Sequence, residues 1–459
     1  MAYRVERDTL GEVSVPKNAY YGAQTQRAVE NFPVSGLRLQ VRFVRAQGTI
    51  KKAAALANIE AGGLDRRVGE AIVRAAQEII DGRLNDQFVV DVYQAGAGTS
   101  QNMNANEVIA NRAIELLGGR RGEYRLVHPN DHVNMGQSTN DTIPTAIHIA
   151  ALDGIERELI PALEGLRDAL RGKAREFHGV IKAGRTHLQD AVPIRLGQEF
   201  GAYAAMVDHG IARVKRASGD LRELNLGGNA VGTGINTRPG YAERAIAEIN
   251  KMTGLHFHKA EDLFEATQNT DAVVDVSGAL RTLVTSLMKI ADDLRLLSSG
   301  PRTGLREINL PAVQPGSSIM PGKVNPVMAE MLDMVCFQVI GNDAAVARAG
   351  QAGQLELNVM MPVIAYNIIN SIEILTGGVR AFTERCVRGI TCNPEICARY
   401  AELSTAVVTA LTPRLGYEKA AALAKEASEK GKTIRELVLE KGLIPEEELR
   451  QLLDLEKMV

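Results

Sequence analysis

Apolar residues recur at helical spacing through the middle of this 459-residue chain. Apolar positions three and four residues apart, most of them leucine or isoleucine, mark three long stretches, at 155–170, 280–297 and 363–379. Such amphipathic helices need partners along their whole length, so the pattern predicts a mainly helical, all-α chain built around a long-helix bundle. Further helices are predicted near residues 41–61, 66–81, 195–225 and 327–347.

One predicted helix is apolar on more than one face. Between Pro362 and Leu375 the apolar residues do not keep to a single stripe. A helix of this kind is buried on several sides, which indicates contact between subunits as well as within one. We therefore expect an oligomer.

The two ends of the chain lack this long periodicity. Glycines and prolines punctuate residues 1–40, which predicts mostly loop there. Near the other end, Thr433 and Glu436 form a capping-box pattern, and Gly442 follows as a stop signal. We expect an N-terminal mixed loop and helical domain (1–137), a central helical bundle (138–390) and a small C-terminal helical domain (391–459).

Composition excludes several classes of protein. Hydrophobic residues make up 45% and charged residues 24%, which is typical of a soluble globular protein. Lys and Arg number 53 against 55 Asp and Glu, so there is no basic excess for nucleic acid. No apolar run approaches the ~20 residues of a membrane helix, and the charged first ten residues do not resemble a signal peptide.

The four cysteines do not form paired C-x-x-C ligand sets. We interpret them as buried or incidental thiols in a reducing compartment, and we expect a cytoplasmic protein. The sequence also offers no cluster of metal-ligating residues, so neither a metal nor another cofactor is predicted.

The most informative segment is residues 316–326, which read G-S-S-I-M-P-G-K-V-N-P. Gly316 and Gly322 allow backbone angles that other residues avoid, whereas Pro321 and Pro326 exclude a regular helix. Such a loop can gather backbone N–H groups, hydroxyls and one cation around a small anion. An ordinary surface turn would explain the glycines and prolines, but not the lysine and asparagine that follow the serine pair.

Four further polar stretches lie beside predicted helices, at 96–107, 128–132, 137–141 and 184–190. Capping alone would account for the first and third of these, because Ser, Thr, Asn and Asp are good N-caps. Capping and function are compatible, since a helix N-terminus offers free N–H groups and a positive dipole end to a carboxylate.

Residues 316–326 closely resemble the signature loop of the fumarase/aspartase superfamily, and residues 184–191 resemble its G-R-T-H-L-Q-D-A segment. The resemblance extends from about Tyr20 to beyond Gly416. It implies an enzyme that adds or removes a small group across the double bond of fumarate or of a fumarate-bearing compound. It also implies a homotetramer, in which the central domains of four subunits form one long bundle.

The resemblance implies a role for each matching residue. Ser317 would be the general base on a flexible loop, and His187 would pair with Glu330. One histidine taken alone is more often structural than catalytic, so this role depends on the resemblance. The substrate-binding residues would be Thr99, Ser138, Thr139, Asn140, Thr186, His187, Ser318, Lys323 and Asn325. In the family these segments come from different subunits. Three residues, His128, Asn130 and Asp131, resemble a second anion site of fumarases.

The chemistry of this family explains these residue types. Removing a proton next to a carboxylate loads a second negative charge onto it, giving a dianionic aci-carboxylate. Several preorganised donors and a cation in a site closed to water stabilise such a species. A serine can act as the base if backbone N–H groups and positive charge stabilise its alkoxide.

Two reactions share this apparatus: deamination of L-aspartate to fumarate and ammonia, and hydration of fumarate to L-malate. Ala97 and Thr139 stand where fumarases usually carry serine, which favours the aspartase reaction. The segment His128–Asp131 favours the fumarase reaction. A non-enzymatic structural oligomer is a third alternative, but such a protein would have no reason to keep Ser317, Lys323, Asn325 and His187 together.

Overall fold

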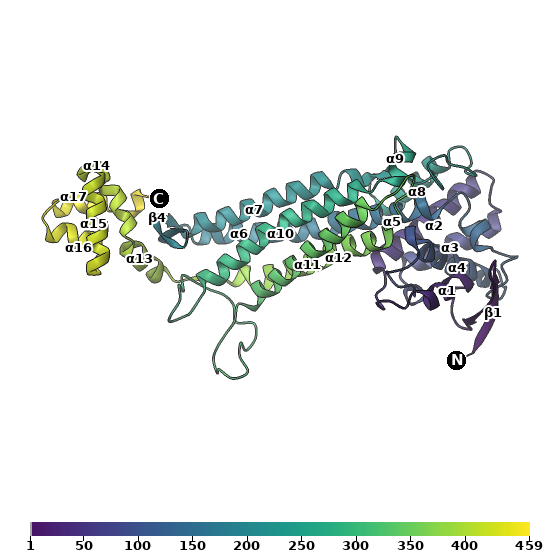
Figure 1. The fold of residues 1–459 in the computed structure, drawn as a ribbon, viewed down its shortest axis with the longest axis horizontal. Helices are drawn as coiled ribbons and strands as arrows, with labels where there is room; N and C mark the ends of the chain where they lie inside the picture. The colour runs from purple at the N-terminus through teal and green to yellow at the C-terminus, as the bar shows by residue number, and fades with distance from the viewer. Residues whose placement is uncertain (1) are drawn as a thin grey trace. The chain divides into compact units, whose positions relative to one another are not determined.

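The computed structural model describes residues 2–459 and is mainly helical (Figure 1). The α-helices are α1 (Ala23–Asn31), α2 (Val41–Glu60), α3 (Arg66–Ile80), α4 (Thr99–Leu116), α5 (Thr139–Gly154), α6 (Ile160–Glu176), α7 (Leu196–Ala217), α8 (Tyr241–Thr253), α9 (Leu263–Gln268), α10 (Asp271–Leu297), α11 (Val327–Gln351), α12 (Met361–Arg385), α13 (Pro394–Leu403), α14 (Thr412–Leu415), α15 (Tyr417–Lys430), α16 (Ile434–Glu440) and α17 (Glu446–Leu452).

Strands in the described part of the chain are short and form four two-stranded sheets. Three of the sheets are antiparallel, and the β5–β6 pair is parallel. The strands are β1 (Tyr3–Asp8), β2 (Gly11–Pro16), β3 (Ile181–Thr186), β4 (Gln189–Arg195), β5 (Glu223–Leu224), β6 (His258–Lys259), β7 (Ile308–Asn309) and β8 (Thr391–Cys392).

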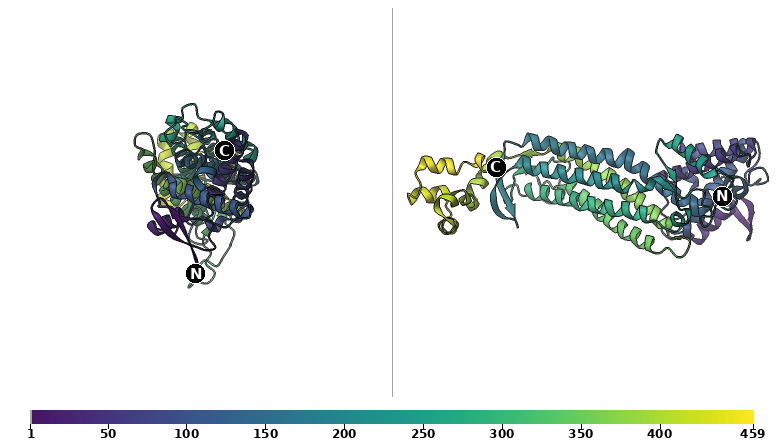
Figure 2. Two further views of the ribbon diagram at one scale, coloured as in Figure 1. Left: turned by 90° about the vertical axis from the view of Figure 1, so that its right-hand side faces the viewer. Right: turned by 90° about the horizontal axis from the view of Figure 1, so that it is seen from above.

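The helical bundle predicted from periodicity is confirmed. Long helices cover the three periodic stretches, and α6, α7, α10, α11 and α12 run side by side (Figures 1 and 2). In α10 each apolar position of the pattern, from Leu280 to Leu297, is at most 5% exposed. Burying one such side chain contributes about 1.5–3 kcal/mol, so these stripes hold the helices together.

Pro144 lies inside α5 and does not begin it. The helix begins five residues earlier, at Thr139, because Ser138 caps it together with Asp141 in a capping box. Proline has no N–H and so leaves the carbonyl of Asn140 without its helical partner. The side-chain amide of Asn225 donates to this carbonyl at 3.0 Å, which makes the internal proline tolerable.

The expectation of mostly loop over residues 1–40 is wrong for much of that segment. Strands β1 and β2 form a hairpin that pairs Tyr3 with Pro16 and Asp8 with Gly11, and helix α1 follows. Val13 and Val15 alternate with polar residues and are buried. This period of two was the strand signal in the sequence.

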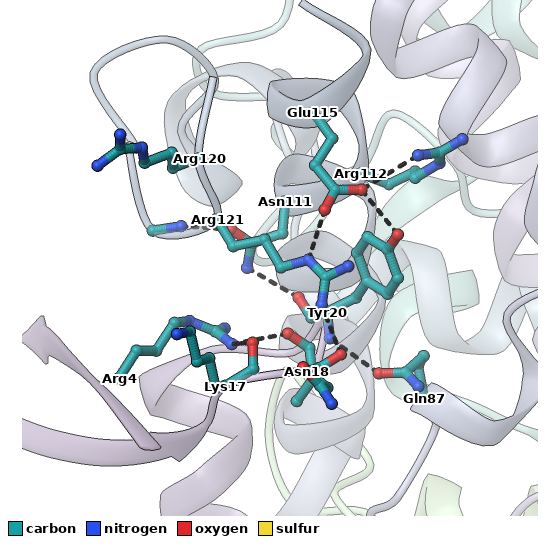
Figure 3. Close-up of polar contacts among 12 residues, drawn as sticks. Arg4, Lys17, Asn18, Tyr20, Gln87, Asn111, Arg112, Glu115, Arg120 and Arg121 are labelled. Atoms are coloured by element: carbon teal, nitrogen blue, oxygen red, sulfur yellow. Dashed lines mark hydrogen bonds and ion pairs between the residues drawn. The ribbon is translucent and has the colours of Figure 1, made fainter. Parts of the chain in front are cut away.

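Polar contacts fasten this N-terminal segment to α4 (Figure 3). The Tyr20 hydroxyl donates to Glu115 at 2.7 Å, and the Arg121 guanidinium lies 3.8 Å from the centre of the Tyr20 ring. Arg121 also donates to Glu115 at 2.7 Å, while Arg4 of β1 donates to the carbonyl of Ala19 at 2.8 Å. The segment leading into α1 is therefore held in place by ionic and aromatic contacts.

The C-terminal helices have a hydrophobic core of their own, drawn from residues between Val407 and Leu453. The capping box of Thr433 and Glu436 is confirmed at the start of α16, and Gly442 follows that helix with a φ of 61°. No helix within residues 2–459 is long and apolar enough to cross a membrane.

Contacts divide the chain into two compact units. Unit 1 comprises Met1–Pro161, Ala212–Val284 and Cys336–Thr376. Unit 2 comprises Ala162–Ile211, Thr285–Val335 and Gly377–Val459. The three domains expected from the sequence remain a proposal.

Candidate functional site

The loop at residues 316–326 belongs to unit 2 and is closed by its own hydrogen bonds. The N–H of Gly316 donates to the carbonyl of Lys323 at 2.8 Å, and the Asn325 amide donates to the carbonyl of Gly316 at 2.6 Å. A Cβ at Gly316 would lie 2.4 Å from the Lys323 carbonyl oxygen, so only glycine allows this approach. The two ends of the loop are thereby brought together.

The Ser317 hydroxyl oxygen accepts two backbone hydrogen bonds. The N–H of Met320 donates to it at 2.8 Å and the N–H of Ile319 at 3.2 Å. Donors aimed at an oxygen stabilise negative charge on it. Ser318 and Lys323 in the same loop are exposed, and no described residue accepts a hydrogen bond from the Lys323 ammonium group. The loop thus offers a solvent-exposed ammonium group and a hydroxyl whose oxygen faces two N–H donors that would stabilise negative charge on it.

Thr186 and His187 lie at the tip of the β3–β4 hairpin, also in unit 2. His187 and Leu188 both adopt left-handed backbone angles, with φ of 56° and 58°. Such angles at two non-glycine residues cost free energy and persist only when the surroundings impose them. The tip is exposed, and Leu188 is 71% exposed. The hairpin therefore projects a histidine and a threonine outward on a strained turn.

A buried ion-pair network anchors the base of that hairpin. The Glu307 carboxylate is fully buried and lies 2.9 Å from both Lys182 and Arg185 of β3. Lys182 also pairs with Glu199 of α7 at 2.9 Å. The backbone carbonyl of Glu307 accepts from the N–H of Asn393. Removing one partner from such a network would leave an uncompensated buried charge, so the network fixes the hairpin firmly.

The other candidate substrate residues lie at helix N-termini in unit 1. Thr99 begins α4 directly after Ala97 and Gly98, both of which have positive φ. Ser138 caps α5, and Thr139 and Asn140 form its first turn. The expected capping of α5 is confirmed. Part of each first turn is already satisfied, because the N–H of Gln101 donates to Gln94 Oε1 at 2.8 Å and that of Asn140 donates to Ser138 Oγ at 3.2 Å. Both termini still present the positive end of a helix dipole.

The Asn140 side chain already has a hydrogen-bond acceptor within the protein. Its amide donates to the carbonyl of Ala230 at 2.8 Å. The neighbouring Asp141 carboxylate is buried and accepts from the N–H groups of Ser138, Gly227 and Asn229 at 3.0–3.1 Å. Burial raises the pKa of Asp141 to about 6. This corner therefore ties the α5 N-terminus to the segment that follows β5.

His128, Asn130 and Asp131 form a local turn. The His128 Nδ1 atom accepts from the N–H groups of Asn130 and Asp131, both at 3.2 Å. The Asp131 carboxylate lies 3.4 Å from the same nitrogen. The side chain of His128 thus occupies the two N–H groups that an anion would use. Whether this turn binds an anion stays a prediction.

The candidate residues gather in two groups within one chain. Thr99 and the Ser138–Asn140 turn belong to unit 1, whereas Thr186, His187, the 316–326 loop and Glu330 belong to unit 2. Glu330 lies in the first turn of α11, and no hydrogen bond or ion pair within residues 2–459 joins it to His187. The His187–Glu330 pair therefore stays a prediction.

Sequence reasoning missed two buried polar residues that support these groups, Glu307 and Lys51, and it assigned no separate role to Asn102 within the polar stretch 96–107. Lys51 and Asn102 are each at most 1% exposed, and Glu307 is fully buried. The one local signal of a buried polar site was a lysine next to the alanine run of α2. Charged residues are seldom fully buried without a partner, so such a lysine points to polar groups around it. Within residues 2–459, no group of three or more His, Cys, Asp or Glu side chains could hold a metal ion.

Comparison with known proteins agrees with this architecture. The chain matches the family described as "Lyase" over residues 11–341 and that described as "Fumarase C C-terminus" over residues 407–459. It is 52% identical to an aspartate ammonia-lyase of Bacillus sp over 451 residues, covering 98% of this chain and 96% of the relative. It is 54% identical to a class II fumarate hydratase of Halobacterium salinarum over 456 residues, covering 99% and 97%.

A solved structure has the same fold. The crystal structure of fumarate lyase:delta crystallin from Brucella melitensis bound to cobalt superposes with a TM-score of 0.96 at 52% identity. The match covers 100% of this chain and 99% of that one.

Proposed function

This chain belongs to the fumarase/aspartase superfamily, and on that premise we propose that it deaminates L-aspartate reversibly to fumarate and ammonia. The observation that carries the proposal is that the Ser317 hydroxyl oxygen accepts hydrogen bonds from two backbone N–H groups, in the same loop as Lys323 and Asn325. A general base must be deprotonated before it can take a proton, and for serine that form is the negatively charged alkoxide. These two donors favour the alkoxide of Ser317 over the neutral hydroxyl.

The proposed reaction has two steps. Ser317 removes a proton from C3 of L-aspartate, and the electron pair moves onto the adjacent carboxylate, which becomes a dianionic aci-carboxylate. The electrons then return to form the C2–C3 double bond while the C2–N bond breaks and ammonia leaves. The first step sets the barrier that the protein must lower, because it concentrates charge on one carboxylate.

Lys323 and the helix N-termini supply the stabilisation in this proposal. Lys323 would bind the carboxylate that becomes a dianion, and Asn325 and Ser318 would add donors from the same loop. Thr99, Ser138, Thr139, Thr186 and His187 would bind the remaining carboxylate oxygens. Donors that are fixed before the reaction cost no reorganisation as charge develops. Glu330 would orient His187 from a neighbouring subunit.

Fumarate hydration is the second candidate function. It is favoured by the His128–Asp131 turn and by the similarity to a class II fumarate hydratase, and it would use the same serine and the same carboxylate pocket. Ala97 and Thr139 favour the aspartase reaction instead, since fumarases usually carry serine at these positions. A small apolar side chain at Ala97, which is 4% exposed, leaves one hydroxyl fewer beside the α4 N-terminus.

A single assay separates the two reactions. The protein is mixed separately with L-aspartate and with L-malate, and fumarate is followed by its absorbance. We expect L-aspartate to give the faster signal. A strong signal from L-malate with none from L-aspartate would reverse the assignment, and no fumarate from either substrate would exclude both reactions.

We further propose that the active form is a homotetramer in the cytoplasm. Met334 and Phe337 on α11 are 63% and 56% exposed in the single chain, and large exposed apolar residues on one helix suit a subunit interface. Because the proposed site takes residues from several subunits, dissociation should abolish activity. Sedimentation at micromolar concentration, with activity measured across the gradient, should find activity only in the tetramer. A fully active monomer would contradict the shared site.

A further inference from the structure

A lysine buried inside unit 1 has no acidic partner in contact. Lys51 of α2 is 1% exposed, and its ammonium group donates to Asn102 Oδ1 at 2.8 Å and to Asn134 Oδ1 and Gln137 Oε1 at 2.9 Å. All three acceptors are neutral amides. Lys182, the other deeply buried lysine described above, has two carboxylates at 2.9 Å. Lys51 is therefore a buried cation without a contacting counter-ion, which is a costly arrangement.

The chemistry of the ammonium group sets the direction of every hydrogen bond around it. A protonated lysine can only donate, so the oxygen of the Asn102 side chain must face the Lys51 ammonium group and its NH₂ group must face away. That NH₂ group donates to Thr139 Oγ1 at 3.1 Å. The Thr139 oxygen is thus used as an acceptor.

This leaves the Thr139 hydroxyl proton available for a ligand. Within residues 2–459, no oxygen accepts a hydrogen bond from this hydroxyl. A buried hydroxyl that accepts one bond and still has its proton free is oriented as a donor. Hydrogen bonds therefore run in one direction from Lys51 to Asn102 and from Asn102 to Thr139, each residue donating to the next. The last member, Thr139, keeps an O–H group that no described residue accepts.

The same lysine holds the turn before α5. Gln137 accepts from Lys51, and its own NH₂ group donates to the carbonyls of Val133 and Met135 at 3.0 and 3.3 Å. This arrangement fixes the residue directly before Ser138, the N-cap of α5. One buried ammonium group thus positions both the cap and the first residue of that helix.

We propose that Lys51 is a positioning residue that turns the Thr139 hydroxyl proton, through Asn102, toward a carboxylate of the substrate. The positive charge of Lys51 lies on the protein side of that donor, and the bound carboxylate acts as the counter-ion of Lys51. This inference rests on the proposed function, because it takes the ligand of Thr139 to be a dicarboxylate. Lys51 itself is buried and does not touch the substrate.

A double-mutant cycle tests the link, with succinate as a dicarboxylate probe that cannot undergo the elimination. The variants are Lys51→Met, Thr139→Val and the pair together, and the affinity for succinate is measured by calorimetry. We expect each single substitution to weaken binding by about tenfold or more, since a hydrogen bond to a charged group contributes about 1.5–3 kcal/mol. We expect the double variant to be little weaker than the worse single one, because both substitutions remove the same donor.

Lys52→Met is the matched control. Lys52 is the next residue on α2, and it donates to Gln77 of α3 at 2.7 Å, outside the chain that ends at Thr139. This variant loses the same charge and should bind succinate as the wild type does. Unchanged succinate affinity in Lys51→Met, or losses that multiply in the double variant, would overturn the proposal.

A second variant covers the case in which Lys51→Met does not fold. In Asn102→Asp, one carboxylate oxygen can accept from Lys51 and the other can accept the Thr139 proton. We expect this protein to keep its thermal stability, because Lys51 gains a counter-ion, but to lose at least tenfold in succinate affinity. A merely structural role for the network predicts no such loss, and unchanged affinity would contradict the proposal.

The pH dependence of succinate binding gives an independent readout. Burial lowers the pKa of Lys51 to about 7, and Asp141 of α5 is the charged group whose field opposes this shift. A bound dianion favours the protonated lysine, so wild-type affinity should fall as the pH rises above 7, whereas Lys51→Met should lack that fall. If the wild-type protein binds succinate but converts neither L-aspartate nor L-malate, the proposed function is refuted. The double-mutant cycle of succinate affinity still tests the role of Lys51 in that case.

Discussion

Replacing Ser317 by alanine should abolish turnover while leaving the fold and much of the substrate affinity intact. The hydroxyl belongs to a partly exposed loop, so its loss should change the free energy of unfolding by no more than about 1 kcal/mol. Its proposed task is proton abstraction, and a positioned general base contributes about 10²–10⁴-fold to the rate. We therefore expect kcat to fall by that factor, with a much smaller change in the affinity for succinate.

The control for this variant is Gln314→Ala, which alters an exposed side chain just before the same loop. It should retain wild-type kcat and KM. If Ser317→Ala kept a tenth of the wild-type kcat, the loop would be only a lid. The base would then have to be sought elsewhere, and His187 on its strained hairpin tip would be the next candidate.

Replacing Lys323 by alanine should lower both affinity and rate. The ammonium group has no protein acceptor within the described residues, so it is free for a substrate carboxylate. It would bind that carboxylate in the ground state and bind the dianion more strongly, since the attraction grows with the charge. We expect succinate affinity to fall by about tenfold or more from the lost charge-assisted bond, and kcat to fall in addition.

Lys419→Ala removes one positive charge from an exposed position on α15 and serves as the matched control. Steady-state kinetics and succinate titration of both variants would separate a local effect of Lys323 from a change in net charge. A Lys323→Ala protein with a normal kcat and a raised KM would mean that the lysine binds the substrate and the transition state equally strongly, with no extra stabilisation of the developing dianion.

Local patterns in the sequence determined most of the helices and the shape of the 316–326 loop. Helices α2, α3, α7, α10, α11 and α12 follow from spacing of apolar residues, and the α16 capping box follows from Thr433 and Glu436. The 316–326 loop was found because glycine, proline, serine and lysine act there through neighbours a few residues away. The β1–β2 hairpin was overlooked although its period of two was present.

Only the tertiary structure decided how these elements are supported. Lys51 and Asn102 are 51 positions apart, and Arg185 and Glu307 are 122 apart, yet each pair forms a hydrogen bond of 2.8–2.9 Å. No local periodicity records such contacts, because a buried polar group is specified by the partner that satisfies it rather than by its neighbours in sequence. The sequence thus predicted which residues would carry the chemistry, while packing decided what contacts the Thr139 side chain and what holds the His187 hairpin.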